Sequence, residues 1–196
     1  RRWMRRLGVV ALVAVILQGV LGGLTVLYFL PAPISVGHAG LAQLFFCLVV
    51  GLALFTSASW RRPASAAVDD ARLRRRMVIL TSIVYGQILL GATMRHIGAG
   101  LAIPDFPLSF GRVLPPTWSA QIAVHFAHRV GALIVTSLVL ATTGHALYHH
   151  GSQGELRRPS ILLLVLVSVQ ITLGALTVLS GKQFIINSLH VVTGAA

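Results

Sequence analysis

Long apolar stretches alternate with short polar connections along this chain. Five of them are long enough to cross a bilayer, which needs about 20 apolar residues, and they cover about residues 7–30, 37–60, 77–97, 120–147 and 161–180. A sixth stretch begins near Phe184 and is shorter. Because an open strand leaves its backbone polar groups unpaired in lipid, each stretch is predicted to be a helix. The pattern predicts an all-α, polytopic membrane helical bundle with about six helices.

Composition agrees with a membrane protein. Of the 196 residues, 56% are hydrophobic and 10% are charged, whereas soluble domains have roughly 25% charged residues. The net charge of +12 comes from basic runs between apolar stretches, which is typical of topology signals, so nucleic-acid binding is not expected. The last apolar stretch is too short to span a bilayer. We therefore expect the sequence to be a piece of a longer protein that has further helices at both ends.

The basic runs lie on one side of the predicted membrane map. They precede the first helix and follow the second and the fourth, and they comprise Arg1, Arg2, Arg5, Arg6, Arg61, Arg62, Arg72, Arg74, Arg75, Arg76, Arg157 and Arg158. The positive-inside rule makes this side cytoplasmic, and the expected location is a bacterial inner membrane with the N-terminus of this chain inside. His145, His149 and His150 lie at the same boundary and are interpreted as a solvated helix end.

Five histidines lie toward the opposite side: His38, His96, His125, His128 and His190. Ionisable groups within membrane segments are costly and usually face the bundle interior, where they serve a purpose. Neutral imidazoles ligate iron, and facing helices of a bundle build cofactor sites. Since Cys47 is the single cysteine and Asp105 the only acid near this side, haem fits better than zinc or an iron–sulfur cluster. Arg95 and Arg129 are candidate partners of haem propionates.

His125 and His128 lie three residues apart and share one face of their predicted helix. Two adjacent imidazoles cannot ligate one iron from opposite sides. We therefore expect one of them to be the ligand and the other to form a hydrogen bond. The alternative for any of these histidines is a buried polar group without a cofactor.

An internal repeat relates two parts of the chain at an offset of 152 residues. It pairs Gln18 with Gln170, Gly22 with Gly174 and His38 with His190. A weaker third copy covers residues 87–91 (QILLG) in the third helix. Repeated helix groups are common in polytopic membrane proteins, so His38 and His190 are predicted to occupy equivalent places in two bundles. We interpret the glycines as points of close helix approach and the glutamines as interhelical hydrogen-bond donors.

Three segments together resemble the haem A synthases. They are LLGATMRHIGAGLAIPDFPLSFG (Leu89–Gly111), VHFAHRVGAL, and QITLGALTVL followed by His190. That family oxidises the methyl group of haem O to the formyl group of haem A for cytochrome oxidase assembly. The resemblance implies two homologous four-helix bundles, each holding a haem between two histidines. In the second bundle His128 and His190 would ligate a haem b that transfers electrons, and His38 would be a catalytic-site ligand in the first bundle, where haem O is oxidised.

The resemblance also divides the chain. Residues 1–60 would be the last two helices of the first bundle, residues 61–76 a cytoplasmic basic linker, and residues 77–196 the second bundle with its last helix truncated. The implied cofactor is haem b, with haem O as substrate and haem A as product. The implied partners are the lipid bilayer and the farnesyltransferase that makes haem O, a homo-oligomer is compatible with the pattern, and the electron donor stays open.

Two departures from the family pattern change the expectation. Ile103 and Ser109 stand where many relatives have cysteines, and His125 stands at the counterpart of the catalytic glutamate. The chain is therefore expected to hold the electron-transfer site and an incomplete catalytic site, with His96 and His125 flanking haem. The Gly- and Pro-rich loop around Asp105 is either a lid over the site or a plain connector. The competing functions are a b-type cytochrome subunit of a quinone-linked oxidoreductase and a haem carrier without turnover.

Overall fold

The structure is a computed structural model that describes residues 2–61 and 68–196. Over these residues it is all-α, and five helices are long and apolar enough to span a membrane, so the predicted fold class is confirmed and the chain is an integral membrane protein. The helices are α1 (Arg2–Leu27), α2 (Ala32–Thr56), α3 (Ala58–Arg61), α4 (Ala71–His96), the 3-10 helix η1 (Ala99–Leu101), α5 (Ala120–His150), α6 (Gly154–Leu179) and α7 (Phe184–Ala195).

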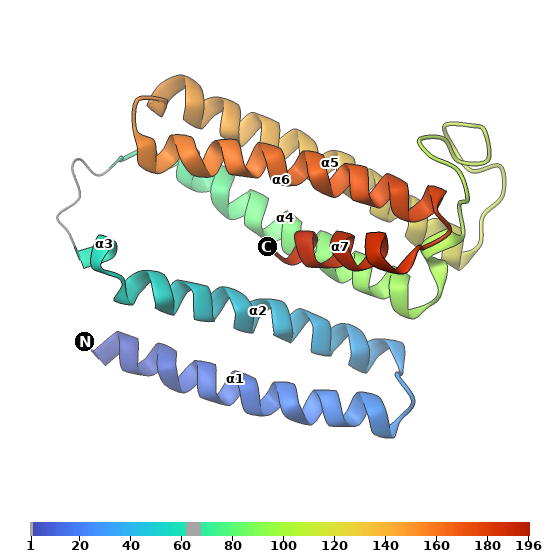
Figure 1. Ribbon diagram of the computed structural model, residues 1–196, viewed down its shortest axis with the longest axis horizontal. Helices are drawn as coiled ribbons and strands as arrows, with labels where there is room; N and C mark the ends of the chain where they lie inside the picture. The colour runs from blue at the N-terminus through green and yellow to red at the C-terminus, as the bar shows by residue number, and fades with distance from the viewer. Residues whose placement is uncertain (1, 62–67) are drawn as a thin grey trace. The chain divides into compact units, whose positions relative to one another are not determined.

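The chain divides into two compact units, Arg1–Asp69 and Asp70–Ala196. In the first unit, α1 and α2 form an antiparallel helical hairpin (Figure 1). In the second unit, α4 packs on α5, α5 on α6 and α6 on α7. The most apolar window of α5 is 22% buried, against 6% for each of the other four long helices. The core of the second unit therefore follows α5.

Several helices begin earlier than the apolar stretches that predicted them. α1 begins at Arg2, α4 at Ala71 and α6 at Gly154, each several residues before its apolar stretch. Intrahelical hydrogen bonds form as readily outside the hydrocarbon as within it, and arginine is a good helix former. Hydrophobicity therefore located each membrane-spanning segment but not the end of its helix.

Part of the expected basic linker, residues 61–76, is helical where it is described. Helix α4 already begins at Ala71, because the Asp70 carboxylate caps it by accepting a hydrogen bond from the Leu73 backbone N–H at 2.8 Å. Residues 62–67 of the expected linker lie outside the described residues.

The internal repeat extends to the backbone at the ends of α1 and α6. The Leu30 N–H donates to the Thr25 carbonyl at 2.7 Å, and the Lys182 N–H donates to the Thr177 carbonyl at 2.8 Å. Leu30 and Lys182 both adopt left-handed backbone, with φ of 61° and 65°. In both turns the donor lies five residues after the acceptor, as at many helix C-termini. Thr25 corresponds to Thr177 and Leu30 to Lys182 at the repeat offset of 152 residues. The turns that lead into α2 and α7 therefore have the same hydrogen bond and the same backbone conformation.

The α4–α5 loop, residues 97–119, is organised by Asp105. The Asp105 carboxylate accepts hydrogen bonds from the backbone N–H groups of Phe110 at 2.8 Å and Gly111 at 2.7 Å. These two hydrogen bonds hold the pKa of the Asp105 carboxyl below its usual range, and the bond from Gly111 has the larger effect. Both residues have left-handed backbone, with φ of 57° and 72°. Asp105 therefore bridges two parts of the loop, which has a defined shape.

Candidate functional site

In three helix pairs a histidine of one helix lies directly against a glycine of the facing helix. A Cβ atom added at Gly22, Gly91 or Gly174 would lie 3.2, 2.9 or 3.1 Å from Cε1 of His38, His128 or His190, respectively. Carbon atoms in favourable contact are about 3.5–4.0 Å apart, so a side chain at any of these glycines would push the imidazole away. The glycines allow close approach as predicted, and the group that approaches is the candidate ligand itself.

In two of the three pairs, the glutamine one turn before the glycine hydrogen-bonds to the facing histidine. The Gln87 amide nitrogen donates to the His128 carbonyl at 2.8 Å and lies 3.1 Å from His128 Nδ1. The Gln18 amide nitrogen donates to the His38 carbonyl at 3.1 Å and lies 3.5 Å from His38 Nε2. These contacts confirm the predicted interhelical role for Gln18 and Gln87. They also show that the weak third copy of the repeat is a structural copy.

The repeat leaves the same polar atoms without partners in both units. The Nδ1 atoms of His38 and His190 are buried and have no hydrogen-bond partner among the described residues, and the same holds for Oε1 of Gln18 and Gln170. The His190 ring also hydrogen-bonds to the Gln170 backbone. A buried polar atom without a partner is costly and rare. Its recurrence at equivalent positions fits imidazoles arranged for a bound group.

His128 and His190 belong to the same unit and interact electrostatically. They come from α5 and α7, two helices that each pack on α6. His38 lies on α2 in the other unit. Its contact with Gly22 has nearly the same geometry as the contact of His190 with Gly174. The second unit thus contains both histidines that the sequence predicts as haem ligands, on two helices that pack on α6.

His125 is enclosed by hydrogen-bonding groups of the protein. It is only 2% exposed, and its Nδ1 lies 3.2 Å from the backbone N–H of the fully buried Ile103. Arg129 Nε lies 3.2 Å from its Nε2. A neutral imidazole has one acceptor nitrogen, so only one of these contacts is a hydrogen bond in a given tautomer. Both ring nitrogens face protein donors, whereas His128 Nε2 is not engaged by Gln87.

Arg129 binds the α4–α5 loop. Its guanidinium donates to the carbonyl groups of Asp105 at 2.6 Å, Leu108 at 2.8 Å and Ile103 at 3.2 Å. The guanidinium carbon also lies 5.8 Å from the centre of the Phe106 ring, a cation–π arrangement. Arg129 thus anchors the loop, because three carbonyls converge on its guanidinium donors. No sequence spacing indicated this role. Its role as a propionate partner stays a prediction.

Arg95 and His96 form the last turn of α4 and interact electrostatically with each other. Arg95 is exposed and His96 is partly buried. Within the described ranges, no hydrogen bond joins either of them to His128 or His190.

Two of the three histidines near the end of α5 differ from the expected solvated helix end. His145 Nε2 and His150 Nε2 lie 2.8 Å and 3.0 Å from the same oxygen, Oδ2 of Asp70. Their side chains are 9% and 18% exposed. The solvated interpretation was wrong for these two, because their partner lies 75 and 80 residues earlier in the chain. His149 remains exposed beside them.

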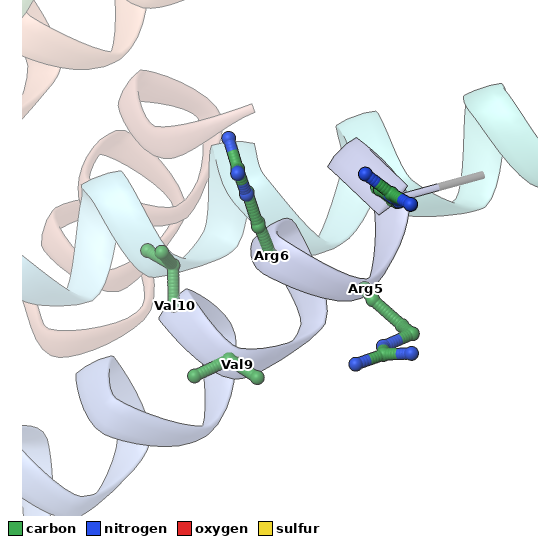
Figure 2. A pocket seen from close by; sticks show the side chains of 5 residues that line it. Arg5, Arg6, Val9 and Val10 are labelled. Carbon is green, nitrogen blue, oxygen red and sulfur yellow. The ribbon is translucent and has the colours of Figure 1, made fainter.

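A hollow along α1 is lined by Arg2, Arg5, Arg6, Val9 and Val10. Figure 2 shows the side chains of Arg5 and Arg6 extending in different directions from the helix. No histidine lines this hollow and its cations do not converge on one point, so it is no candidate for a cofactor site. Basic groups at a membrane boundary suit contact with anionic lipid headgroups.

Comparison with known proteins adds independent information. A family model described as cytochrome oxidase assembly protein matches residues 1–196. The similar proteins include three named Heme A synthase. That of Symbiobacterium thermophilum is 33% identical over 95% of this chain, that of Staphylococcus haemolyticus 28% over 96% and that of Listeria monocytogenes 29% over 97%. The chain spans 62% of the length of each of these relatives.

Proposed function

The chain belongs to the COX15-CtaA family of cytochrome oxidase assembly proteins, and we propose that it forms part of a haem A synthase. The reaction is the oxidation of a methyl group of haem O to the formyl group of haem A. The similar proteins named Heme A synthase support this function. The residues present would contribute a haem b site in the second unit and part of the haem O site in the first.

The hydrogen bonding of the His190 ring is the observation that carries the proposal. Its ring hydrogen-bonds to the Gln170 backbone while its Nδ1 is buried without a partner. Metal-ligating histidines typically donate one ring N–H to a carbonyl, which fixes the tautomer and leaves the lone pair on the other nitrogen. We propose that His190 and His128, a ring on α5 that interacts electrostatically with it, would together hold haem b.

His128 requires an adjustment to ligate iron through Nε2. An amide N–H that donates to Nδ1 leaves the ring proton on Nε2, where it blocks a metal bond. Turning the Gln87 amide so that its oxygen accepts from Nδ1–H would free the Nε2 lone pair. The turn would give up the 2.8 Å hydrogen bond that the same amide nitrogen donates to the His128 carbonyl and gain one from Nδ1–H, so Gln87 would set which nitrogen of His128 is available.

Haem supplies one-electron redox chemistry at iron, and ligation from both sides by imidazole leaves no open position, which suits electron transfer. The residues of the chain hold and orient the two rings. Gly91 and Gly174 let the rings lie close to the helix backbones, and the Gln87 amide lies against the His128 ring. His38, held against Gly22 in the same way, is the proposed ligand in the first unit, where haem O would be oxidised.

The flanking residues have different proposed roles. Arg95 is exposed and is the proposed partner of a haem propionate, with His96 beside it. Arg129 and His125 would act through the loop, because their polar atoms are engaged with it. By the positive-inside rule these groups lie on the extracytoplasmic side of the bilayer and the N-terminus of this chain is cytoplasmic. Haem O would come from the farnesyltransferase that produces it, and a homo-oligomer remains compatible.

Pigment analysis of the full-length protein tests the function. Cells that supply haem O should yield protein containing haem b and haem A. Protein that contains only haem b would support a b-type cytochrome instead, and colourless protein would overturn every haem-based function.

Ligand substitutions test the site. His128→Ala and His190→Ala should each remove the low-spin spectrum of the second-unit haem. The matched control is His149→Ala, an exposed histidine on the same helix as His128. An unchanged spectrum in His128→Ala would remove that residue from the ligand pair.

A further inference from the structure

Three potential metal ligands converge where α4 begins and α5 ends. They come from Asp70, His145 and His150, each of which offers one ligand atom within 4.8 Å of the other two. Nε2 of His145 and Nε2 of His150 lie 2.8 Å and 3.0 Å from Oδ2 of Asp70. The cluster joins parts of the chain that are 75 and 80 residues apart. It is separate from the histidines of the proposed haem sites, which the positive-inside rule places on the other side of the bilayer.

The position of the carboxylate is fixed by the fold. Oδ1 of Asp70 accepts from the Leu73 backbone N–H as the cap of α4, which leaves Oδ2 directed to the imidazoles. A flexible surface carboxylate would have to be ordered first, at a cost in side-chain entropy. Here the helix cap has already ordered it.

The geometry is close to that of a metal site. Zinc ligands lie at about 2.0–2.2 Å from the ion, so a tetrahedral site separates neighbouring ligand atoms by roughly 3.4 Å. The two imidazole-to-carboxylate distances are 2.8 and 3.0 Å. Small side-chain rotations that move the imidazole nitrogens by well under 1 Å would lengthen these two distances to the required separation. Two nitrogens and one oxygen suit divalent ions such as zinc, nickel or cobalt, whereas magnesium and calcium prefer oxygen alone.

The cluster is also accessible. The side chains of Asp70 and His150 are 17% and 18% exposed, so an ion can enter from water and keep a water molecule as its fourth ligand. His145 is more enclosed, at 9%. The exposed His149 ring packs on it, with centroids 4.5 Å apart. The site would thus be open on one side and held by protein on the other.

We propose that Asp70, His145 and His150 bind one divalent transition-metal ion of the zinc class, which clamps the start of α4 to the end of α5. The ion would replace two hydrogen bonds to one oxygen by three metal bonds. Its role is structural, since it joins the two helices whose opposite ends carry the α4–α5 loop. The inference does not depend on the haem proposal.

Zinc binding by the purified full-length protein tests this inference. The protein is isolated through a tag that contains no histidine, treated with a chelator, and exposed to zinc chloride, and bound zinc is measured by mass spectrometry. We expect one zinc ion per chain. Asp70→Asn keeps the capping oxygen of α4 but removes the charged ligand, and His150→Ala removes an imidazole. Both should weaken zinc binding by more than the roughly 10–100-fold typical for loss of a residue behind a metal ligand.

The matched control is His149→Ala, which removes a neighbouring imidazole outside the ligand set and should keep zinc binding unchanged. The helical circular dichroism and the gel-filtration profile of each variant check that the protein is folded. Absence of stoichiometric zinc in the unaltered protein would overturn the proposal and leave the cluster as a hydrogen-bonded clasp. Equal zinc binding in Asp70→Asn and the unaltered protein would overturn it as well.

Discussion

His128 lies against Gly91 so closely that a Cβ atom at residue 91 would be 2.9 Å from its Cε1. This is the tightest of the three histidine–glycine contacts, which recur in α1–α2, α4–α5 and α6–α7. In each pair the glycine lies four residues after a glutamine. The recurring unit therefore comprises a glutamine, a glycine and a facing histidine.

Replacing Gly91 by alanine should displace His128 by roughly 0.6–1 Å, the distance needed to restore an ordinary carbon–carbon contact. Overpacking of this kind costs about 1–3 kcal/mol, so we expect the variant to retain markedly less second-unit haem. The absorbance of reduced haem per mole of purified protein measures this. Gly86→Ala is the matched control, because a Cβ at Gly86 meets nothing within 4 Å. Equal haem content in both variants would contradict the positioning role of Gly91.

Replacing Gln87 by methionine should loosen His128 without filling space, because methionine is similar in length but cannot donate to Nδ1 or to the carbonyl. Loss of a partner behind a metal ligand typically lowers metal affinity by about 10–100-fold. We expect a comparable loss of haem retention and a shifted reduction potential. Gln121→Met is the control, since the Gln121 amide binds the Ile97 carbonyl and no histidine. A potential unchanged by Gln87→Met would indicate that Gln87 holds only the backbone.

Arg129→Leu and Arg95→Leu should have separable effects. Arg129 donates to three loop carbonyls, and hydrogen bonds from a charged group are each worth about 1.5–3 kcal/mol. We therefore expect Arg129→Leu to expose the α4–α5 loop to limited proteolysis. Arg95→Leu should leave the loop protected and reduce haem retention. Protease resistance in Arg129→Leu equal to that of the unaltered protein would rule out the anchoring role.

The stability of the loop should depend on pH through Asp105. Its pKa in the folded protein is lowered by the amide donors Gly111 and Phe110, from an unfolded value of about 3.9. A lowered pKa means that the ionised carboxylate stabilises the fold at every pH above the unfolded value. This contribution declines as the pH falls from about 4 through the lower folded pKa. Hydrogen exchange of the loop amides, measured across acidic pH, should show this loss of protection.

Asp105→Asn provides the comparison for that measurement. The asparagine amide has one acceptor oxygen, so it satisfies one of the two backbone donors and does not titrate. The variant should have weaker protection at neutral pH and no added loss below pH of about 4. An identical acid profile in both proteins would assign the pH dependence to another group.

The sequence by itself determined the architecture of this membrane protein and the identity of most candidate ligands. Apolar stretches specify membrane helices because burial of apolar side chains in lipid is a property of each segment alone. The repeat could be found for the same reason, since Gln18, Gly22 and His38 recur in one register. Family resemblance then pointed to haem, and the match of the family model over the whole chain bears out that resemblance.

Only the tertiary structure decided which groups meet. Gln87 contacts His128 across 41 residues, and Asp70 contacts His145 across 75. Arg129 reaches carbonyl groups, which carry no signature in the sequence because every residue has one. Such contacts depend on how the helices pack and where the loop turns back. Hydrophobicity along the chain specifies which segments become helices, whereas the polar partners of each side chain are set by the packing of those helices against one another.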